Sequence, residues 1–249
     1  MFAAGCLAGM INSVAGGGTL VSFPALIWLG RDPIVANVTN TVAIWPGSLG
    51  AMFGFRRELG NSRRWMALLA GPSMIGGLVG AVLLLQTPSR VFAAIVPYLI
   101  LFATILFALQ EPITRVLRPH RSRSGATASG HAWWLWAGAF QFFVALYGGY
   151  FGAGIGILML AALGLLGLTD IHQMNGLKNF FAVCINLIAA GYFVLWGPVA
   201  WTDALIMATG TIAGGYGGAG LARRLGRRFV RRAVIVIGFA MAASFLFRR

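Results

Sequence analysis

Apolar segments long enough to cross a lipid bilayer follow one another along nearly the whole chain, and they constrain the fold more than any other feature. A hydrocarbon layer roughly 30 Å thick needs a helix of about 20 apolar residues. Only 10% of the residues are charged, roughly half the fraction usual in a soluble domain. The sequence therefore predicts an all-α, polytopic integral membrane protein. The apolar segments cover residues 2–30, 34–55, 65–86, 90–109, 133–167, 172–196, 200–222 and 231–247.

The basic residues indicate membrane topology rather than nucleic-acid binding. The formal net charge is +14, but the arginines are grouped in connectors between the apolar segments, at 56–64, 115–123 and 223–232. Basic connectors stay on the cytoplasmic side of a membrane and face anionic lipid headgroups. We therefore expect a multi-pass protein of the cytoplasmic (inner) membrane that is surrounded by the lipid bilayer and has no nucleic-acid partner.

The two halves of the chain repeat one another at an offset of 138 residues. Internal duplication is typical of secondary transporters, whose binding sites form where the repeats meet. At this offset three features coincide: 14–20 with 152–158, Asn37 with Asn175, and 76–81 with 214–219. We divide the chain into a first transmembrane repeat (1–110), a polar basic linker (111–131) and a second transmembrane repeat (132–249).

The distribution of arginines favours inverted, pseudo-symmetric repeats of four helical segments each. In the first half, the connector 56–64 is rich in arginine and the connector 86–90 carries only Arg90. In the second half the pattern is exchanged: 196–203, the equivalent of 56–64, has no arginine, and 222–232, the equivalent of 86–90, has six. If basic connectors stay cytoplasmic, the second half is upside down relative to the first. Inversion needs an odd number of crossings per half, so the overlong first segment of each half would be broken or re-entrant. Eight full crossings in two parallel halves are the alternative.

Glycine motifs mark the middle of both overlong first segments. Glycine lowers the barrier to leaving the helix and lets a ligand approach the backbone. A helix that restarts after such a break directs N–H groups and a partial positive charge into the membrane, which favours an anion. Close helix packing is the structural alternative, and we expect it for Gly76, Gly80, Gly214 and Gly218. The two motifs are Gly16-Gly17-Gly18-Thr19 and Gly154-Ile155-Gly156.

The only lysine, Lys178, lies inside an apolar segment with no carboxylate nearby in the sequence. Counted from the start of its segment, it lies about 10 Å deep at 1.5 Å per residue. It shares one helical face with Asn175 and Asn179, and Asn37 and Asn40 occupy the corresponding stretch of the first half. Buried amides without partners each cost about 1–3 kcal/mol, so the group implies a hydrated or ligand-filled cavity. A cation held there would attract an anion from outside; a snorkelling lysine and amides that bridge helices are the alternatives.

Residue patterns for enzymatic, metal or cofactor chemistry are lacking. His120, His131 and His172 do not have metal-ligand spacing, and no serine lies in a recognisable nucleophile setting. The stretch 215–220 fits G-x-G-x-x-G, but it follows a helix-like run and has no acidic residue downstream. We expect no enzyme activity, no metal and no cofactor. His172 is the candidate for proton coupling, and a capping role at a helix start is its alternative.

Several of these stretches are similar to the signatures of one known family. They are 12–24, 36–42, 46–48, 148–156 and 175–179. Together they resemble the TauE/SafE family of sulfite and organosulfur-anion exporters, and the resemblance covers nearly the whole chain. It implies a bacterial inner-membrane permease for sulfite, sulfoacetate, thiosulfate or a related small anion.

The sequence predicts a secondary transporter that moves a small, sulfur-containing anion by alternating access. We expect backbone N–H groups of both glycine motifs to bind the anion, together with the lysine and amide side chains. An anion channel, and a membrane scaffold or partner subunit without transport, are the alternatives; a homodimer is left open. The expected substrate-binding residues are Gly16, Gly17, Gly18, Thr19, Asn37, Asn40, Gly154, Ile155, Gly156, Asn175, Lys178 and Asn179.

Overall fold

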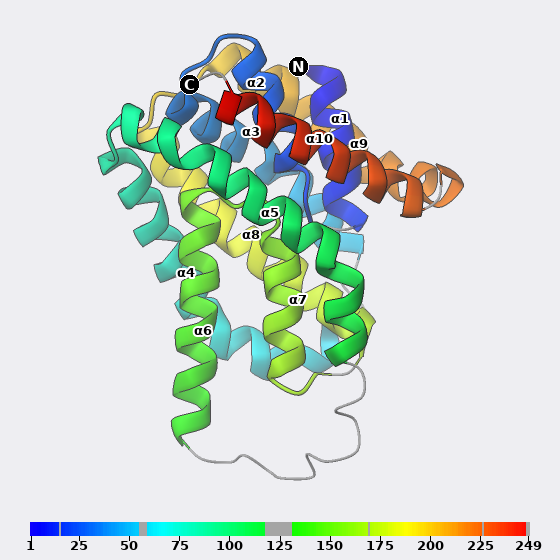
Figure 1. Cartoon of the computed structure of the whole chain (residues 1–249). Helices are drawn as coiled ribbons and strands as arrows, with labels where there is room; N and C mark the ends of the chain where they lie inside the picture. Colours follow the sequence, from blue (N-terminus) through cyan, green and yellow to red (C-terminus); the bar gives the residue numbers. More distant parts are fainter. Residues whose placement is uncertain (15, 55–58, 118–130, 169, 226, 248–249) are drawn as a thin grey trace.

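Helices make up all the regular structure that is described for this chain (Figure 1). The computed structural model describes every residue except 15, 55–58, 118–130, 169, 226 and 248–249. The all-α prediction is confirmed for these residues. The helices are α1 (Phe2–Val14), α2 (Thr19–Trp28), α3 (Pro33–Gly54), a short 3-10 helix η1 (Gly60–Ser62), α4 (Arg63–Gln86), α5 (Ser89–Leu117), α6 (His131–Tyr150), α7 (Ile155–Leu165), α8 (Ile171–Trp196), α9 (Trp201–Leu225) and α10 (Arg227–Phe247).

The helices follow the apolar segments, with differences at the first segment and the linker. Each overlong first segment contains two helices, α1 and α2 in one case and α6 and α7 in the other. α5 continues to Leu117, so the beginning of the predicted linker 111–131 is helical. Ile113, Val116 and Leu117 extend the apolar helical spacing there, and this spacing favours continuation of the helix. Residues 118–130 of the linker lie outside the described part.

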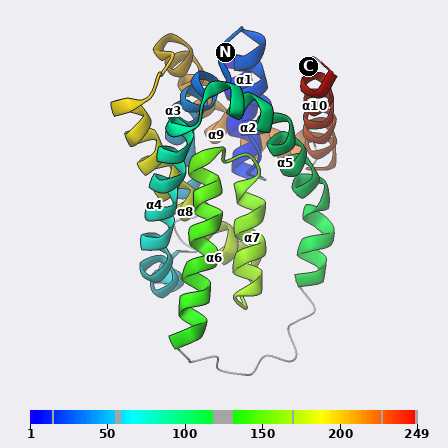
Figure 2. The same ribbon diagram turned by 60° about the vertical axis from the view of Figure 1, so that its left-hand side comes forward.

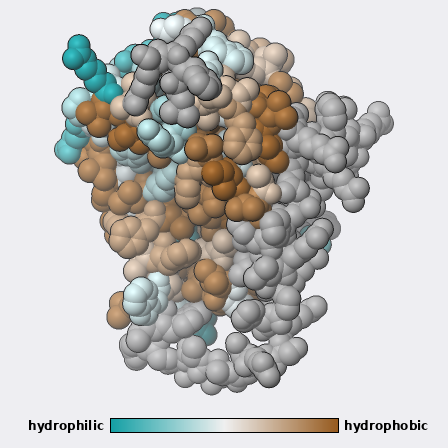
Figure 3. All heavy atoms as spheres, viewed as in Figure 1, coloured by the Kyte–Doolittle hydropathy of each residue, from teal (hydrophilic) through white to brown (hydrophobic). Residues whose placement is uncertain are grey.

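Three helices of the described part are long and apolar enough to cross a membrane, judged by length and composition. They are Arg63–Gln86, Ser89–Leu109 and His172–Trp196. Large apolar side chains on these helices, such as Ile75, Tyr98 and Leu195, are exposed rather than buried. Figure 3 shows hydrophobic residues across much of the middle of one face. Apolar surface on this scale indicates a lipid environment rather than water.

The two halves of the chain exchange their first helices. α1 packs along α9 of the second half, and α6 packs along α4 of the first half. α3 and α8 contact each other, and α5 contacts α10 (Figures 1 and 2). Each half is thus built into the other, and the centre of the molecule is formed by both.

Glycines bring the exchanged helices into close contact. A Cβ built at Gly80 of α4 would collide with the carbonyl oxygen of Leu146 in α6, and one at Gly76 with the carbonyl of Phe142. On the other side, a Cβ at Gly214 of α9 would collide with the carbonyl of Cys6 in α1. The packing role expected for these three glycines is therefore observed. The surroundings of Gly218 lie outside the described part.

The turns after α2 and α7 have the same construction. Gly30 and Gly167 follow the two helices in the left-handed conformation, with φ of 78° and 89°, which glycine adopts without steric cost. Asp32 and Asp170 then cap the next helices, each accepting a hydrogen bond of 2.9 Å from the N–H two residues on. The α2 turn lies at the top of Figures 1 and 2, and the α7 turn lies towards the bottom.

We predict that Gly80→Ala destabilises the protein, whereas Gly71→Ala on the same helix does not. The added methyl at position 80 would force α4 and α6 apart, and overpacking of this kind costs about 1–3 kcal/mol. At Gly71 a Cβ would meet no atom within 4 Å. The thermal unfolding midpoint in detergent measures the difference. Equal midpoints for the two variants would contradict the assigned packing contact.

Candidate functional site

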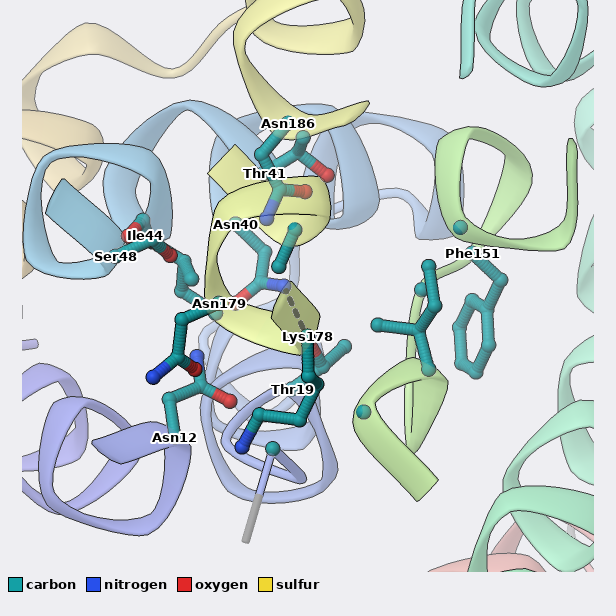
Figure 4. Close-up of a pocket in the computed structure, with 16 residues that line it drawn as sticks. Asn12, Thr19, Asn40, Thr41, Ile44, Ser48, Phe151, Lys178, Asn179 and Asn186 are labelled. Carbon is teal, nitrogen blue, oxygen red and sulfur yellow. Dashed lines mark hydrogen bonds between the residues drawn. The ribbon is translucent and has the colours of Figure 1, made fainter. Parts of the chain in front are cut away.

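A cavity lies where the two interrupted first segments meet α3 and α8 (Figure 4). Its volume is about 50 Å³, space for a few water molecules or an anion of about four heavy atoms. The side chains and backbone around it come from both halves of the chain. The lining residues are Asn12, Gly16, Thr19, Asn40, Thr41, Ile44, Ser48, Gly148, Phe151, Gly152, Ile155, Gly156, Lys178, Asn179, Ala182 and Asn186.

The two interruptions touch each other at glycines. Gly16 has a φ of 75°, and a Cβ built on it would lie 3.0 Å from the Cα of Gly156. α2 begins at Thr19 and α7 begins at Ile155, and both residues line the cavity. The N-terminal ends of two helices therefore lie at one cavity. The partial positive charges of these helix ends favour an anion in that space.

Lys178 brings an amino group, which carries a full positive charge when protonated, to the cavity. This residue of α8 is 2% exposed, and in Figure 4 its side chain extends towards Asn12 and Thr19. The neighbouring Asn179 is also buried, and its Nδ2 has no hydrogen-bond partner among the described residues. None of the lining residues is a carboxylate. The cavity is thus rich in donors and positive charge, which complements a negative solute.

Equivalent positions of α3 and α8 line the cavity. Four residues of α3 line the cavity, and each has an equivalent on α8, 138 residues further on, that lines it too. In each helix the positions are i, i+1, i+4 and i+8, which lie on one helical face. The pairs are Asn40 with Lys178, Thr41 with Asn179, Ile44 with Ala182, and Ser48 with Asn186.

The N-terminal end of α2 is joined to α3 by side-chain hydrogen bonds. The Ser22 hydroxyl donates to Oδ1 of Asn40, and Nδ2 of Asn40 donates to Oγ1 of Thr19 at 3.4 Å. The Oδ1 atom of Asn12 accepts a hydrogen bond of 2.8 Å from the Gly18 N–H. These contacts fix the end of α2 that faces the cavity.

Asn37 does not line the cavity, although we expected it to bind substrate. Its side chain is fully buried, and its Nδ2 donates a hydrogen bond of 2.9 Å to the carbonyl of Tyr150 at the end of α6. The Tyr147 hydroxyl similarly donates to the carbonyl of Ala153 at 2.7 Å. The first contact satisfies a carbonyl that α6 leaves unpaired where it stops, and the second satisfies a carbonyl in the turn between α6 and α7. In this structure Asn37 therefore supports the second interruption from the other half.

Other expected site residues also lie away from the cavity lining. Asn175 is partly buried on α8, and His172 is exposed at its second position, where its backbone N–H is capped by Asp170. The remaining three belong to the glycine motifs and pack against neighbouring helices; these are Gly17, Gly18 and Gly154.

Several N–H groups of the glycine motifs are already hydrogen-bonded within the protein. We expected these N–H groups to be available to an anion, but they donate hydrogen bonds to nearby groups of their own hairpin. The acceptors are the carbonyl of Ile11 for Gly16, Oδ1 of Asn12 for Gly18, the carbonyl of Gly152 for Ile155, and the carbonyl of Gly154 for Ile157. Side-chain donors must therefore carry more of any anion contact than the sequence indicated.

Four polar lining residues were not among the expected ligands: Asn12, Thr41, Ser48 and Asn186. Asn186 is an amide in the middle of an apolar segment, and its counterpart at the repeat offset is the polar Ser48. Polar residues at matching positions in two apolar segments are a signal that could have revealed both. Asn12 precedes the first glycine motif, where the sequence gives no direction for its side chain.

The family of the chain follows from a family model that matches residues 1–245 and describes the sulfite exporter TauE/SafE. The chain belongs to the TauE/SafE family. Relatives of this TauE/SafE protein are named probable membrane transporter proteins. One from Haemophilus influenzae is 28% identical and covers 99% of this chain and 93% of its own. YfcA of Escherichia coli is 27% identical (99% and 88%), and ORF9 of Sinorhizobium sp is 25% identical (99% and 91%).

No solved structure matches the chain. The family and the apolar helices together make this TauE/SafE protein an integral membrane protein. The resemblance of the glycine and asparagine stretches to this family is confirmed by the match over the whole chain.

We predict that Gly16→Ala impairs folding more than Gly30→Ala does. Both glycines have the left-handed backbone, with φ of 75° and 78°, so each alanine carries the same penalty of about 1–2 kcal/mol. A Cβ at Gly16 would also press on Gly156, whereas one at Gly30 would meet nothing within 4 Å. Thermal midpoints and monodispersity in detergent provide the comparison. Equal losses in the two variants would show that the contact between the interruptions adds nothing.

Proposed function

We propose that this protein is a multi-pass permease of the cytoplasmic membrane that moves a small sulfur-containing anion, such as sulfite or a sulfonate, by alternating access. One observation carries the proposal: a buried ammonium, that of Lys178, lies at a cavity shared with the N-terminal ends of α2 and α7. Holding a charge in a membrane interior is costly, and such residues mark ion and substrate pathways. The names of the relatives support transport as the activity.

The substrate class rests on the family description and on the chemistry of the cavity. A sulfur oxyanion spreads its negative charge over several oxygens, each of which accepts hydrogen bonds. The Lys178 ammonium has three donors, and the Asn179 amide has two. The hydroxyls of Thr41 and Ser48 already donate to carbonyls in their own helix, so they offer acceptors rather than donors. In this proposal, the preference for a negatively charged solute therefore depends mainly on the side chains of α8.

Alternating access in this proposal uses inverted repeats with re-entrant first segments. Three observations support it: the halves exchange their first helices, equivalent faces of α3 and α8 line one cavity, and equally built turns lie at opposite ends of the molecule. Rocking of one half against the other would open the cavity to each side in turn.

Coupling to a proton would not use a carboxylate in the cavity, because its lining contains none. His172 lies outside the lining, so a proton-coupled form of this mechanism would depend on Lys178 itself. Uniport of the anion requires no such step. A proton gradient imposed on liposomes separates the two forms.

We predict that Lys178→Met lowers uptake of radiolabelled sulfite into liposomes by about tenfold or more, the expected loss of a charged hydrogen bond to the substrate. Arg90→Met removes a positive charge from an exposed position outside the cavity and keeps wild-type uptake. Both variants should keep the wild-type elution profile in detergent. Unchanged uptake by Lys178→Met would remove this residue from the mechanism, and a steady single-channel current would identify a channel instead.

Inversion predicts that cysteines at positions 30 and 167 react with membrane-impermeant maleimide from opposite sides of the membrane. Gly30→Cys and Gly167→Cys form a matched pair, since both glycines are exposed, left-handed and without neighbours within 4 Å of an added Cβ. The background is a variant in which Cys6 and Cys184 are replaced by alanine. Labelling of both positions from the same side would favour parallel halves.

A further inference from the structure

The two segment interruptions are connected to α3 and α8 by different chemistry. We call α1–α2 the first hairpin and α6–α7 the second hairpin. In the first hairpin, the Ser22 hydroxyl lies 2.5 Å from Oδ1 of Asn40 and 3.1 Å from the carbonyl of Gly18. The Asn40 amide reaches Oγ1 of Thr19 at 3.4 Å. One amide of α3 thus joins the first and fourth residues of α2.

The second hairpin has no polar group at the equivalent positions. At the offset of 138 residues, Ile157 and Leu160 stand in place of Thr19 and Ser22, and both are buried and apolar. Lys178 stands in place of Asn40. The position that carries an amide bonded to its own hairpin in one half therefore carries a lysine in the other half, where the two equivalent hairpin positions have no hydroxyl.

Both polar atoms of the Asn40 side chain are directed to α2. The residue is 1% exposed and Ser22 is fully buried, so water cannot replace these contacts. If Asn40 turned to a substrate, the Ser22 hydroxyl would keep only its longer contact of 3.1 Å to the Gly18 carbonyl, and both hydrogen bonds between α3 and α2 would be lost. Asn40 is therefore better suited to hold α2 than to bind the solute, although it lines the cavity.

We propose that Ser22 and Asn40 are positioning residues: they hold the N-terminal end of α2 against α3, so that Thr19 and the helix end remain at the anion site. The proposal rests on the proposed function for its substrate and gives Asn40 a different role from the ligand role predicted from the sequence. Lys178 in the second half would select a negatively charged solute, and the first half would hold the N-terminal end of α2 in a fixed position beside it.

The test removes the hydroxyl of Ser22 and compares sulfite transport in liposomes. Ser22→Ala raises the KM about three- to tenfold, the effect of one buried hydrogen bond, and leaves Vmax unchanged. Ser22→Thr keeps the hydroxyl and restores the KM. Ser73→Ala is the matched control, because Ser73 is equally buried and accepts a hydrogen bond of 2.8 Å from Gln141 between α4 and α6, away from the cavity. It lowers thermal stability and keeps the wild-type KM.

A second measurement needs no substrate. Deuterium exchange of the amides in 16–22, followed in lipid nanodiscs, increases in Ser22→Ala and stays at the wild-type level in Ser73→Ala. Thr19→Val removes the hydroxyl at the other end of the Asn40 contact, and it raises the same exchange even where Ser22→Ala does not fold. If the wild type moves no sulfur anion, the proposed function fails, and this exchange still decides the role of Ser22 and Asn40.

Two results would overturn the inference. One is unchanged exchange in both Ser22→Ala and Thr19→Val. The other is an equal rise in KM for Ser22→Ala and Ser73→Ala, which would mean that general loosening of the protein, rather than the position of α2, controls affinity.

Discussion

The contact between Gly16 and Gly156 is the constraint on which the centre of the molecule depends. A Cβ on Gly16 would lie 3.0 Å from the Cα of Gly156, so the two segments lie this close because position 16 has no side chain. The crossing brings the first residues of α2 and α7 to one cavity. It also joins the two halves of the chain, because α1 leads from it to contacts with α9, and α6 leads from it to contacts with α4.

The burial of Lys178 has a physical explanation in this arrangement. An ammonium removed from water loses a large hydration energy, which nearby dipoles and hydrogen bonds must offset. The polar residues Asn12, Thr41 and Ser48 line the same cavity, whereas the two helix ends there are positive and do not help the cation. An anion that entered the cavity would interact favourably with both helix ends and with the ammonium.

The sequence predicted the helices well because each depends on local apolar spacing, and the split of both first segments coincides with glycine motifs visible in the chain. The sequence did not predict which groups the polar side chains would bond to. Asn37 and Asn40 lie one turn apart in α3, yet one reaches Tyr150 of the other half and the other reaches Ser22. That choice depends on where α6 and α2 end in space. The N–H groups of Gly16 and Gly18 likewise close local turns whose geometry the glycine motif alone does not specify.

The two halves of the chain differ at the equivalent positions 40 and 178. In the first half, Asn40 joins α3 to α2 through hydrogen bonds with Thr19 and Ser22. In the second half, Ile157 and Leu160 are buried by apolar packing, which does not depend on direction as a hydrogen bond does. At the equivalent position 178 the residue is a lysine. With the proposed function, support of α2 would depend on position 40 and selection of a negative solute on position 178, so the two halves would have different tasks at equivalent positions.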